Sequence, residues 1–216
     1  MEPTKQGLDR RKFLKQASLA TLASGALLSW TPSVTDPYST PINDINIVGP
    51  KEGYTPQVGT LVSMMNWMRS VILNPVRGMS TKDLDYLVDD KANSIGAMLW
   101  HLAATERFYQ IHTFEGRAWG DWDKADADEF GTAMGLGDAA RESIKGNPLE
   151  FYMEKLDRVR EISLNKLKEL DDDWLLAVDE DWPWGPTNNY CKWFHVVEHE
   201  SNHNGQFKFI RSRLPG

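Results

Sequence analysis

The stretch HVVEHESNHNGQF, residues 195–207, contains three of the five histidines in the 216-residue chain. These three, His195, His199 and His203, follow one another at intervals of four residues. Residues at spacings of three and four share one face of an α-helix, and here they are Val196, His199, His203, Gln206 and Ile210. The stretch therefore predicts a helix whose inward face carries His199 and His203.

Four helices with one apolar face are predicted along the chain. They run from Thr55–Pro56 to Asn74–Pro75 or Gly78, from Asn93–Ser94 past His112, from Asn147 to about Leu170, and from Asn188 to Arg211. A short helix capped by Ser80 is predicted between the first and the second. No run of alternating β-branched residues indicates a sheet. The expected fold class is therefore all-α, a four-helix bundle with mixed short and long connections.

The segment 116–146, between the second and third predicted helices, is acidic and punctuated by glycine. Its aspartates at 121–128 raise the question of a calcium loop. The helix-loop-helix calcium motif needs a ligand at its fifth position and glycine at its sixth, and here those positions hold Ala125 and Asp126. We therefore expect a long solvated loop that contains one short helix.

The N-terminal part of the chain has a different character. RRKFLK at residues 10–15 resembles a twin-arginine export signal, and the apolar run at 17–30 is too short and too weak to span a membrane. Residues 31–54 are rich in Pro, Ser, Thr and Asp and are interpreted as a linker. The expected organisation is a signal segment at 1–30, this linker, and a bundle domain at 55–216.

A twin-arginine signal implies recognition by the export machinery and a periplasmic or otherwise extracytoplasmic location. No Ala-x-Ala cleavage site is visible, so anchoring to the membrane by an uncleaved leader stays open, as does an ordinary amphipathic N-terminal helix. The single cysteine, Cys191, excludes an internal disulfide, which agrees with export of an already folded protein. We expect Cys191 to be a small packing residue.

The charge distribution argues against nucleic acid as a partner. Residues 1–30 carry five basic and two acidic side chains, a net +3, so the −7 of the whole chain leaves −10 for residues 31–216. An acidic body without a basic stripe suits neither nucleic acid nor an anionic lipid surface. The expected partner is a small-molecule substrate or a thiol, and homodimer formation is left open.

A third histidine, His101, lies on the inward face of the second predicted helix, between Met98 and Thr105. His101, His199 and His203 can therefore converge between two helices of a bundle. Three neutral imidazoles bind a divalent metal ion and leave room for water or substrate. Zn, Ni, Fe and Mn all remain candidates for the metal. The alternative is a metal-free bundle in which each buried imidazole needs a hydrogen-bond partner.

Further residues are candidates for the surroundings of this metal. His195, one turn before His199, is assigned to packing or to the shell around the ligands. The other pocket candidates are Gln206, Thr105 and Trp100. His112 lies eleven residues beyond His101, about 16 Å along the helix, which is too far to share the ion. No catalytic residue is assigned.

Two segments carry a resemblance to a known family. GMSTKDLDYLVDDKANSIGAMLWHLAATERFYQ (78–110) and WFHVVEHESNHNGQFKFIRSRL (193–214) resemble the signature regions of the DinB-like superfamily of metal-binding four-helix bundles. The likeness extends over residues 54–213. The family's His-Leu-Ala segment matches residues 101–103, and its His-x-x-x-His-x-Gly-Gln segment matches residues 199–206.

The resemblance implies that His101, His199 and His203 are the metal ligands. The chain departs from the family at Asn204, where arginine is frequent. The segment 116–146 is also longer than the family norm.

Three hypotheses for function follow. The family includes S-transferases and isomerases that use low-molecular-weight thiols, so the resemblance implies an exported metal-dependent transferase or hydrolase that activates a thiol or water. Export weighs against the thiol, because such cosubstrates are expected mainly in the cytoplasm. The pocket would be walled by Trp67, Trp100 or Trp184. The second hypothesis is a non-catalytic metal- or ligand-binding bundle with Glu106 or Glu198 as a fourth ligand, and the third is the metal-free bundle.

Overall fold

The computed structural model describes residues 45–215, so the predicted export signal and most of the predicted linker lie outside the described residues. Four long helices form the bundle: α2 (Pro56–Leu73), α4 (Ile95–Thr113), α7 (Leu149–Leu167) and α9 (Asn189–Arg211). Each occupies a region that the sequence pattern predicts to be helical. The all-α four-helix bundle is therefore confirmed. Among the described residues, no helix is both long and apolar enough to cross a membrane.

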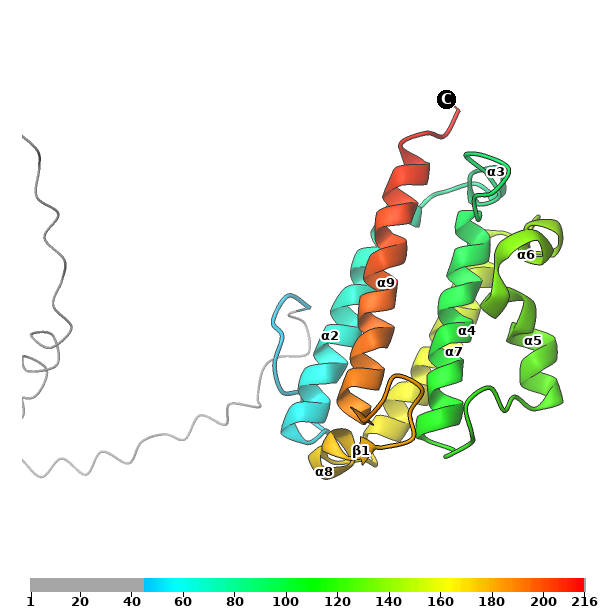
Figure 1. Cartoon of the computed structure of the whole chain (residues 1–216). Coiled ribbons are helices and arrows are strands. Elements are labelled where there is room, and N and C mark those ends of the chain that lie inside the picture. The colour runs from blue at the N-terminus through cyan, green and yellow to red at the C-terminus, as the bar shows by residue number, and fades with distance from the viewer. Residues whose placement is uncertain (1–44, 216) are drawn as a thin grey trace, which may run out of the picture. The chain divides into compact units, whose positions relative to one another are not determined.

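The helices pack as two pairs that share a core. Helix α2 lies along α9, and α4 lies along α7 and also contacts α9 (Figure 1). One apolar cluster lies around α4 and α7, with Leu99 and Leu156 fully buried. A second lies around α2 and α9, with Met65 and Trp193 fully buried. This arrangement places the inward faces of α4 and α9, which carry the histidines, opposite each other.

The helices begin where local capping chemistry predicts, with two differences. Ser80 and Asp83 form the expected capping box of α3 (Thr81–Leu84). Asn188 accepts a hydrogen bond from the Cys191 backbone N–H at the start of α9. Thr55 makes no cap of its own. Instead its hydroxyl and the first backbone N–H groups of α2 donate to Asp172, the first residue of α8 (Asp172–Leu176).

At the start of α7 the N-cap position is Pro148, not Asn147. The Asn147 side chain donates instead to the Tyr152 hydroxyl, 3.3 Å away. The expectation for Cys191 was also wrong, because its side chain is exposed. As the third residue of α9, it lies where that helix begins at the surface.

The remaining elements are short. The 3-10 helix η1 (Asn74–Val76) extends α2, and β1 (Val178–Asp179) pairs antiparallel with β2 (Thr187–Asn188), with Val178 opposite Asn188. This two-residue ribbon is the sheet structure in residues 45–215. It closes the loop that carries Trp182 and Trp184.

The segment 116–146 is more ordered than the sequence indicates. It contains two helices, α5 (Lys124–Gly135) and α6 (Gly137–Ser143), and α5 packs along α4. Phe130 and Ala133 are buried in the same cluster as the core of α4. The expectation of one short helix was wrong because the buried residues of α5 are only Asp126, Phe130 and Ala133, which give a weak apolar pattern.

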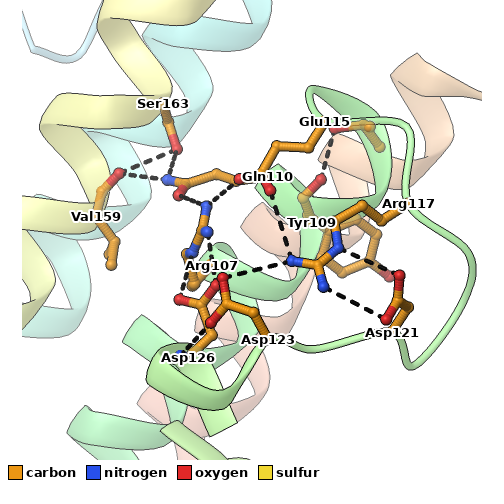
Figure 2. Close-up of polar contacts among 11 residues, drawn as sticks. Arg107, Tyr109, Gln110, Glu115, Arg117, Asp121, Asp123, Asp126, Val159 and Ser163 are labelled. Carbon is orange, nitrogen blue, oxygen red and sulfur yellow. Dashed lines mark hydrogen bonds and ion pairs between the residues drawn. The ribbon is translucent and has the colours of Figure 1, made fainter. Parts of the chain in front are cut away.

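The aspartates of this segment hold it to the bundle. Arg107 on α4 donates to both carboxylate oxygens of Asp126, at 2.8 and 2.7 Å, as Figure 2 shows. Asp123 caps α5 through the Asp126 backbone N–H, and Asp121 accepts from Arg117. These carboxylates therefore bind side chains and backbone of the protein itself.

A second polar cluster lies in the core and takes one charged residue from each bundle helix. Arg69 of α2 and Arg160 of α7 both bind Glu106 of α4 and Glu200 of α9, with N···O distances of 2.7–2.9 Å. All four side chains are at most 8% exposed. The guanidinium groups also donate to the Leu156 and Met65 carbonyls. The cluster is formally neutral and links all four helices.

Candidate metal centre

The structure brings His101, His199 and His203 together between α4 and α9. The Nε2 atoms of His101 and His199 are 2.9 Å apart, and those of His203 and His199 are 3.1 Å apart. The three ring centroids are separated by 4.7–5.1 Å. All three Nε2 atoms therefore point into one small volume.

The hydrogen bonds of Nδ1 in His101 and His203 show which of the two ring nitrogens carries the hydrogen. His101 Nδ1 lies 3.0 Å from the Ala133 carbonyl oxygen, and a carbonyl can only accept, so this nitrogen donates. His203 Nδ1 lies 2.7 Å from the Gln206 side-chain oxygen and donates likewise. A neutral imidazole carries one N–H, so Nε2 of both rings presents a lone pair to the centre of the group.

His199 has two tautomers available, because its Nε2 lies at hydrogen-bond distance from Nε2 of both other rings and can donate one hydrogen to either. Protonation of the rings is opposed because burial, followed by the neighbouring histidines, lowers the pKa of His199 to about 3. Burial, then the charge of His101, lowers the pKa of His203 to about 4. Near neutral pH the rings are therefore uncharged, and all three Nε2 atoms can present lone pairs to a cation when His199 carries its hydrogen on Nδ1.

A divalent metal ion fits this donor set. Nitrogen ligands at 2.0–2.1 Å in a tetrahedron would be about 3.3 Å apart, close to the two Nε2 separations of 2.9 and 3.1 Å. The three ligand atoms all lie within 4.8 Å of one another. The hydrogen bonds from the outer nitrogens to Ala133 and Gln206 are the kind that orient metal-bound histidines. The site can therefore hold a metal ion and leave a coordination position for a ligand.

The predicted neighbours of the triad lie at different distances from it. The His195 ring contacts His199, with 5.4 Å between centroids, and its Nδ1 shares a 3.0 Å hydrogen bond with the Tyr109 hydroxyl. Gln206 binds His203 as described. Thr105 donates to the Met134 sulfur of α5, at 4.0 Å. Trp100 instead packs edge-on against Phe151 of α7, away from the histidine rings.

Of the tryptophans and carboxylates suggested as pocket walls or fourth ligands, some lie near the histidines and others bind elsewhere in the bundle. Trp184 lies against His195, with 5.1 Å between ring centroids. Trp67 packs against the α2–α9 apolar cluster. Glu106 is fully buried and bound by Arg69 and Arg160, so its carboxylate is not available to a metal. Glu198 accepts from Asn202 and lies 4.0 Å from His195.

Sequence reasoning missed the contribution of α5. The Ala133 carbonyl and Met134 come from a segment interpreted as loop, and no side-chain pattern identifies a backbone carbonyl as a hydrogen-bond partner. Tyr109 could have been found, because it lies eight residues after His101 and so shares its helix face.

Comparisons with known proteins agree with the fold. A crystal structure of a conserved protein from Enterococcus faecalis superposes with a TM-score of 0.51 at 12% identity, covering 70% of this chain and 92% of that chain. At this identity the likeness concerns the fold. No curated protein matches the chain. A family model described as mycothiol-S-transferase, which is a family of the DinB-like superfamily, matches residues 60–216. The match includes α4, α7, α9, α2 from Thr60 onward and all three converging histidines, and the chain therefore belongs to the mycothiol-S-transferase family.

Proposed function

We propose that the protein is a metal-dependent S-transferase that joins a low-molecular-weight thiol to a small electrophile. The observation that carries the proposal is the convergence of the Nε2 atoms of three histidines in a chain of this family. A divalent cation held there supplies a positive charge that lowers the pKa of a thiol or water in its open position toward neutral. Family membership favours the thiol over the water of a hydrolase.

The protein's own residues have positioning roles in this reaction. Ala133 and Gln206 fix the rings of His101 and His203 through their Nδ1 atoms, so that the Nε2 lone pairs stay directed inward. Tyr109, which is buried, holds His195 beside His199. In the overall transfer the thiol loses its proton to solvent, sulfur forms a bond to carbon, and the leaving group departs with the electron pair of its own bond.

The proposal is tested by turnover of metal-loaded protein. The full chain is stripped with a chelator, reloaded separately with Zn, Ni, Fe or Mn, and assayed with a thiol and 1-chloro-2,4-dinitrobenzene. We expect turnover that requires both metal and thiol and that is lost in His203→Ala. Product formation that needs metal but no thiol would indicate a hydrolase. Metal binding without either reaction would support a non-catalytic bundle.

We also propose that the chain is exported through its N-terminal segment, which lies outside the described residues. The support is the sequence RRKFLK at residues 10–15. Cell fractionation of the full chain and of a variant with Arg10 and Arg11 replaced by lysine tests this proposal. The wild type is expected in the extracytoplasmic fraction and the variant in the cytoplasm. The N-terminal sequence of the recovered protein shows whether the leader is removed.

A further inference from the structure

Aromatic side chains from two loops and from α9 form a continuous surface that begins beside the histidine triad. This aromatic surface consists of Trp119, Trp182, Trp184 and His195. Trp184 contacts His195, whose ring in turn contacts His199. Trp182 contacts both Trp184 and Trp119, with ring centroids 5.9 and 4.8 Å apart. One side of the candidate metal centre therefore continues into a run of π-systems.

The outer members of this surface are unusually open to solvent. Trp119 is 48% and Trp184 is 51% exposed, whereas Trp182 between them is 5% exposed. Exposed indole rings that adjoin one another leave apolar area in water, and such area commonly marks a binding site. Trp182 supports the two exposed rings from beneath.

The loops that carry these rings are held in place without a ligand. His112 Nδ1 donates to the Arg117 carbonyl at 2.9 Å, and the Gly120 backbone N–H donates to His112 Nε2 at 3.4 Å, which fixes the loop around Trp119. Lys192 binds Asp179 at 2.8 Å and lies over the Trp182 ring. A surface already in position loses little conformational entropy when it binds a ligand.

The other end of the site has a different chemistry. Met98 and Gln206, which both contact His203, also line a pocket of about 320 Å³. Its lining is mixed, with the polar side chains of Asp89, Lys91 and Asn93 beside apolar ones such as Val88 and Ile210. Along α9, His195 and Gln206 are eleven residues apart, about 16 Å, and His199 and His203 lie between them. The converging histidines thus separate an aromatic end from an end of mixed polarity.

We propose that the aromatic surface binds the apolar, planar part of the electrophile. This inference rests on the proposed S-transferase function. An aromatic ring gains most from stacking on Trp184 and Trp119, and Trp184 reaches the histidine triad through His195. The sulfur and the electrophilic carbon then meet near His199.

Two measurements test the proposal in the metal-loaded full chain. The first is the affinity for nitrobenzene, an unreactive aromatic probe, measured by ligand-observed NMR. The second is steady-state kinetics with 1-chloro-2,4-dinitrobenzene and with iodoacetamide, which has no ring. The variants are Trp184→Ala, Trp119→Ala and the control Phe194→Ala. Phe194 is a matched control because it is 50% exposed and precedes His195 on the same helix.

We expect Trp184→Ala to weaken nitrobenzene binding and to raise KM for the aromatic electrophile by about 2- to 10-fold, the range of one aromatic contact. Trp119→Ala should act in the same direction, while KM for iodoacetamide and for the thiol stays unchanged. Phe194→Ala should change none of these values.

An unchanged nitrobenzene affinity in both tryptophan variants overturns the proposal. So does an increase confined to KM for the thiol, which would assign the aromatic surface to the thiol instead. Nitrobenzene binding that depends on Trp184, in a protein that shows no S-transfer, would retain the apolar binding surface and reject the proposed function.

Discussion

The bundle contains two polar clusters, the ion cluster of Arg69, Glu106, Arg160 and Glu200 and the histidine triad, which share helices α4 and α9 and yet have opposite chemical character. Helix α4 contributes His101 to one and Glu106 to the other, and α9 contributes His199 and Glu200 as neighbours in the sequence. In the ion cluster every guanidinium meets two carboxylates. In the histidine triad three imidazole nitrogens face one another. The ion cluster balances its charges among the described residues, although Glu200 Oε2 has no hydrogen-bond partner there, whereas the triad can take up an external cation.

The pKa values express this difference. Burial alone would raise the pKa of Glu106, but Arg160 and Arg69 more than offset it, so the pKa lies below its ordinary value and the group stays charged. In the triad, burial and the neighbouring histidines both act against the charged form. The ion cluster, whose members neutralise one another, favours one specific arrangement of the helices. The histidine triad, whose members oppose one another's charge, is available for binding.

The largest expected effect comes from breaking the ion cluster. Glu106→Gln leaves Arg69 and Arg160 with one carboxylate between them in the core, and we expect the free energy of unfolding to fall by about 3–5 kcal/mol. Urea unfolding of the metal-free protein measures it. A loss below about 1 kcal/mol would show that the four charges are not coupled. Replacing all four charged residues with apolar side chains of similar volume should restore much of the stability.

Metal binding should give the next largest effect. A divalent ion at one hundred times its Kd stabilises the folded state by about 3 kcal/mol, because the unfolded chain lacks the site. We expect Zn to raise Tm of the wild type and to leave His199→Ala unchanged. Calorimetric scans with and without chelator provide the measurement. Equal shifts in both proteins would mean that the ion binds elsewhere.

The pH dependence of the metal-free protein should separate the two clusters further. The pKa of His199 is about 3 in the folded protein, against an ordinary 6.5. The unfolded chain therefore takes up protons that the folded chain resists, and stability present above pH 6.5 is lost as the pH falls toward 3. Urea midpoints between pH 7 and pH 4 should decrease less steeply in His199→Ala. An identical slope in the variant would contradict the lowered pKa.

A smaller effect is expected at the cap of α5, which reaches the triad indirectly. Asp123→Ala removes the hydrogen bond to the Asp126 backbone N–H, and we expect a loss of about 1 kcal/mol in the free energy of unfolding. Because α5 supplies the carbonyl that orients His101, metal affinity should also weaken. Titration with Zn measures this. An unchanged Kd would show that the ring of His101 is held without α5.

The smallest effect serves as the reference for the others. Glu169 pairs with Lys166 at 2.8 Å, and their side chains are 66% and 40% exposed. Glu169→Gln should cost less than about 1 kcal/mol, since exposed ion pairs are largely screened by water. Urea unfolding beside Glu106→Gln compares the two directly. A similar loss in both variants would remove the distinction between buried and exposed pairs.

The sequence predicted the bundle because its signals are local and repeated. Apolar residues at spacings of three and four define α2, α4, α7 and α9, and Ser80 and Asn188 mark helix starts through side chains that cap their own backbone. The same spacing showed that His101, His199 and His203 face inward. Their meeting followed from the bundle geometry and from the family resemblance.

The features that the sequence did not reveal depend on contacts between distant residues. Arg69 and Arg160 look like ordinary polar positions on their helices, and only packing shows that each faces two glutamates. The order of α5 depends on Arg107 reaching Asp126 and on small residues fitting against α4. The orientation of His101 depends on a backbone carbonyl, which every residue possesses.

The central claim is that three imidazoles from α4 and α9 hold a metal ion. The most direct test is the metal content of purified, reloaded protein, measured by plasma mass spectrometry for the wild type, His101→Ala and His112→Asn. His112 is the matched control, since it lies on the same helix and has its own hydrogen bonds. We predict one ion per chain in the wild type and in His112→Asn, and none in His101→Ala. A wild type that binds no ion, or a His101→Ala variant that retains it with unchanged affinity, would contradict the account.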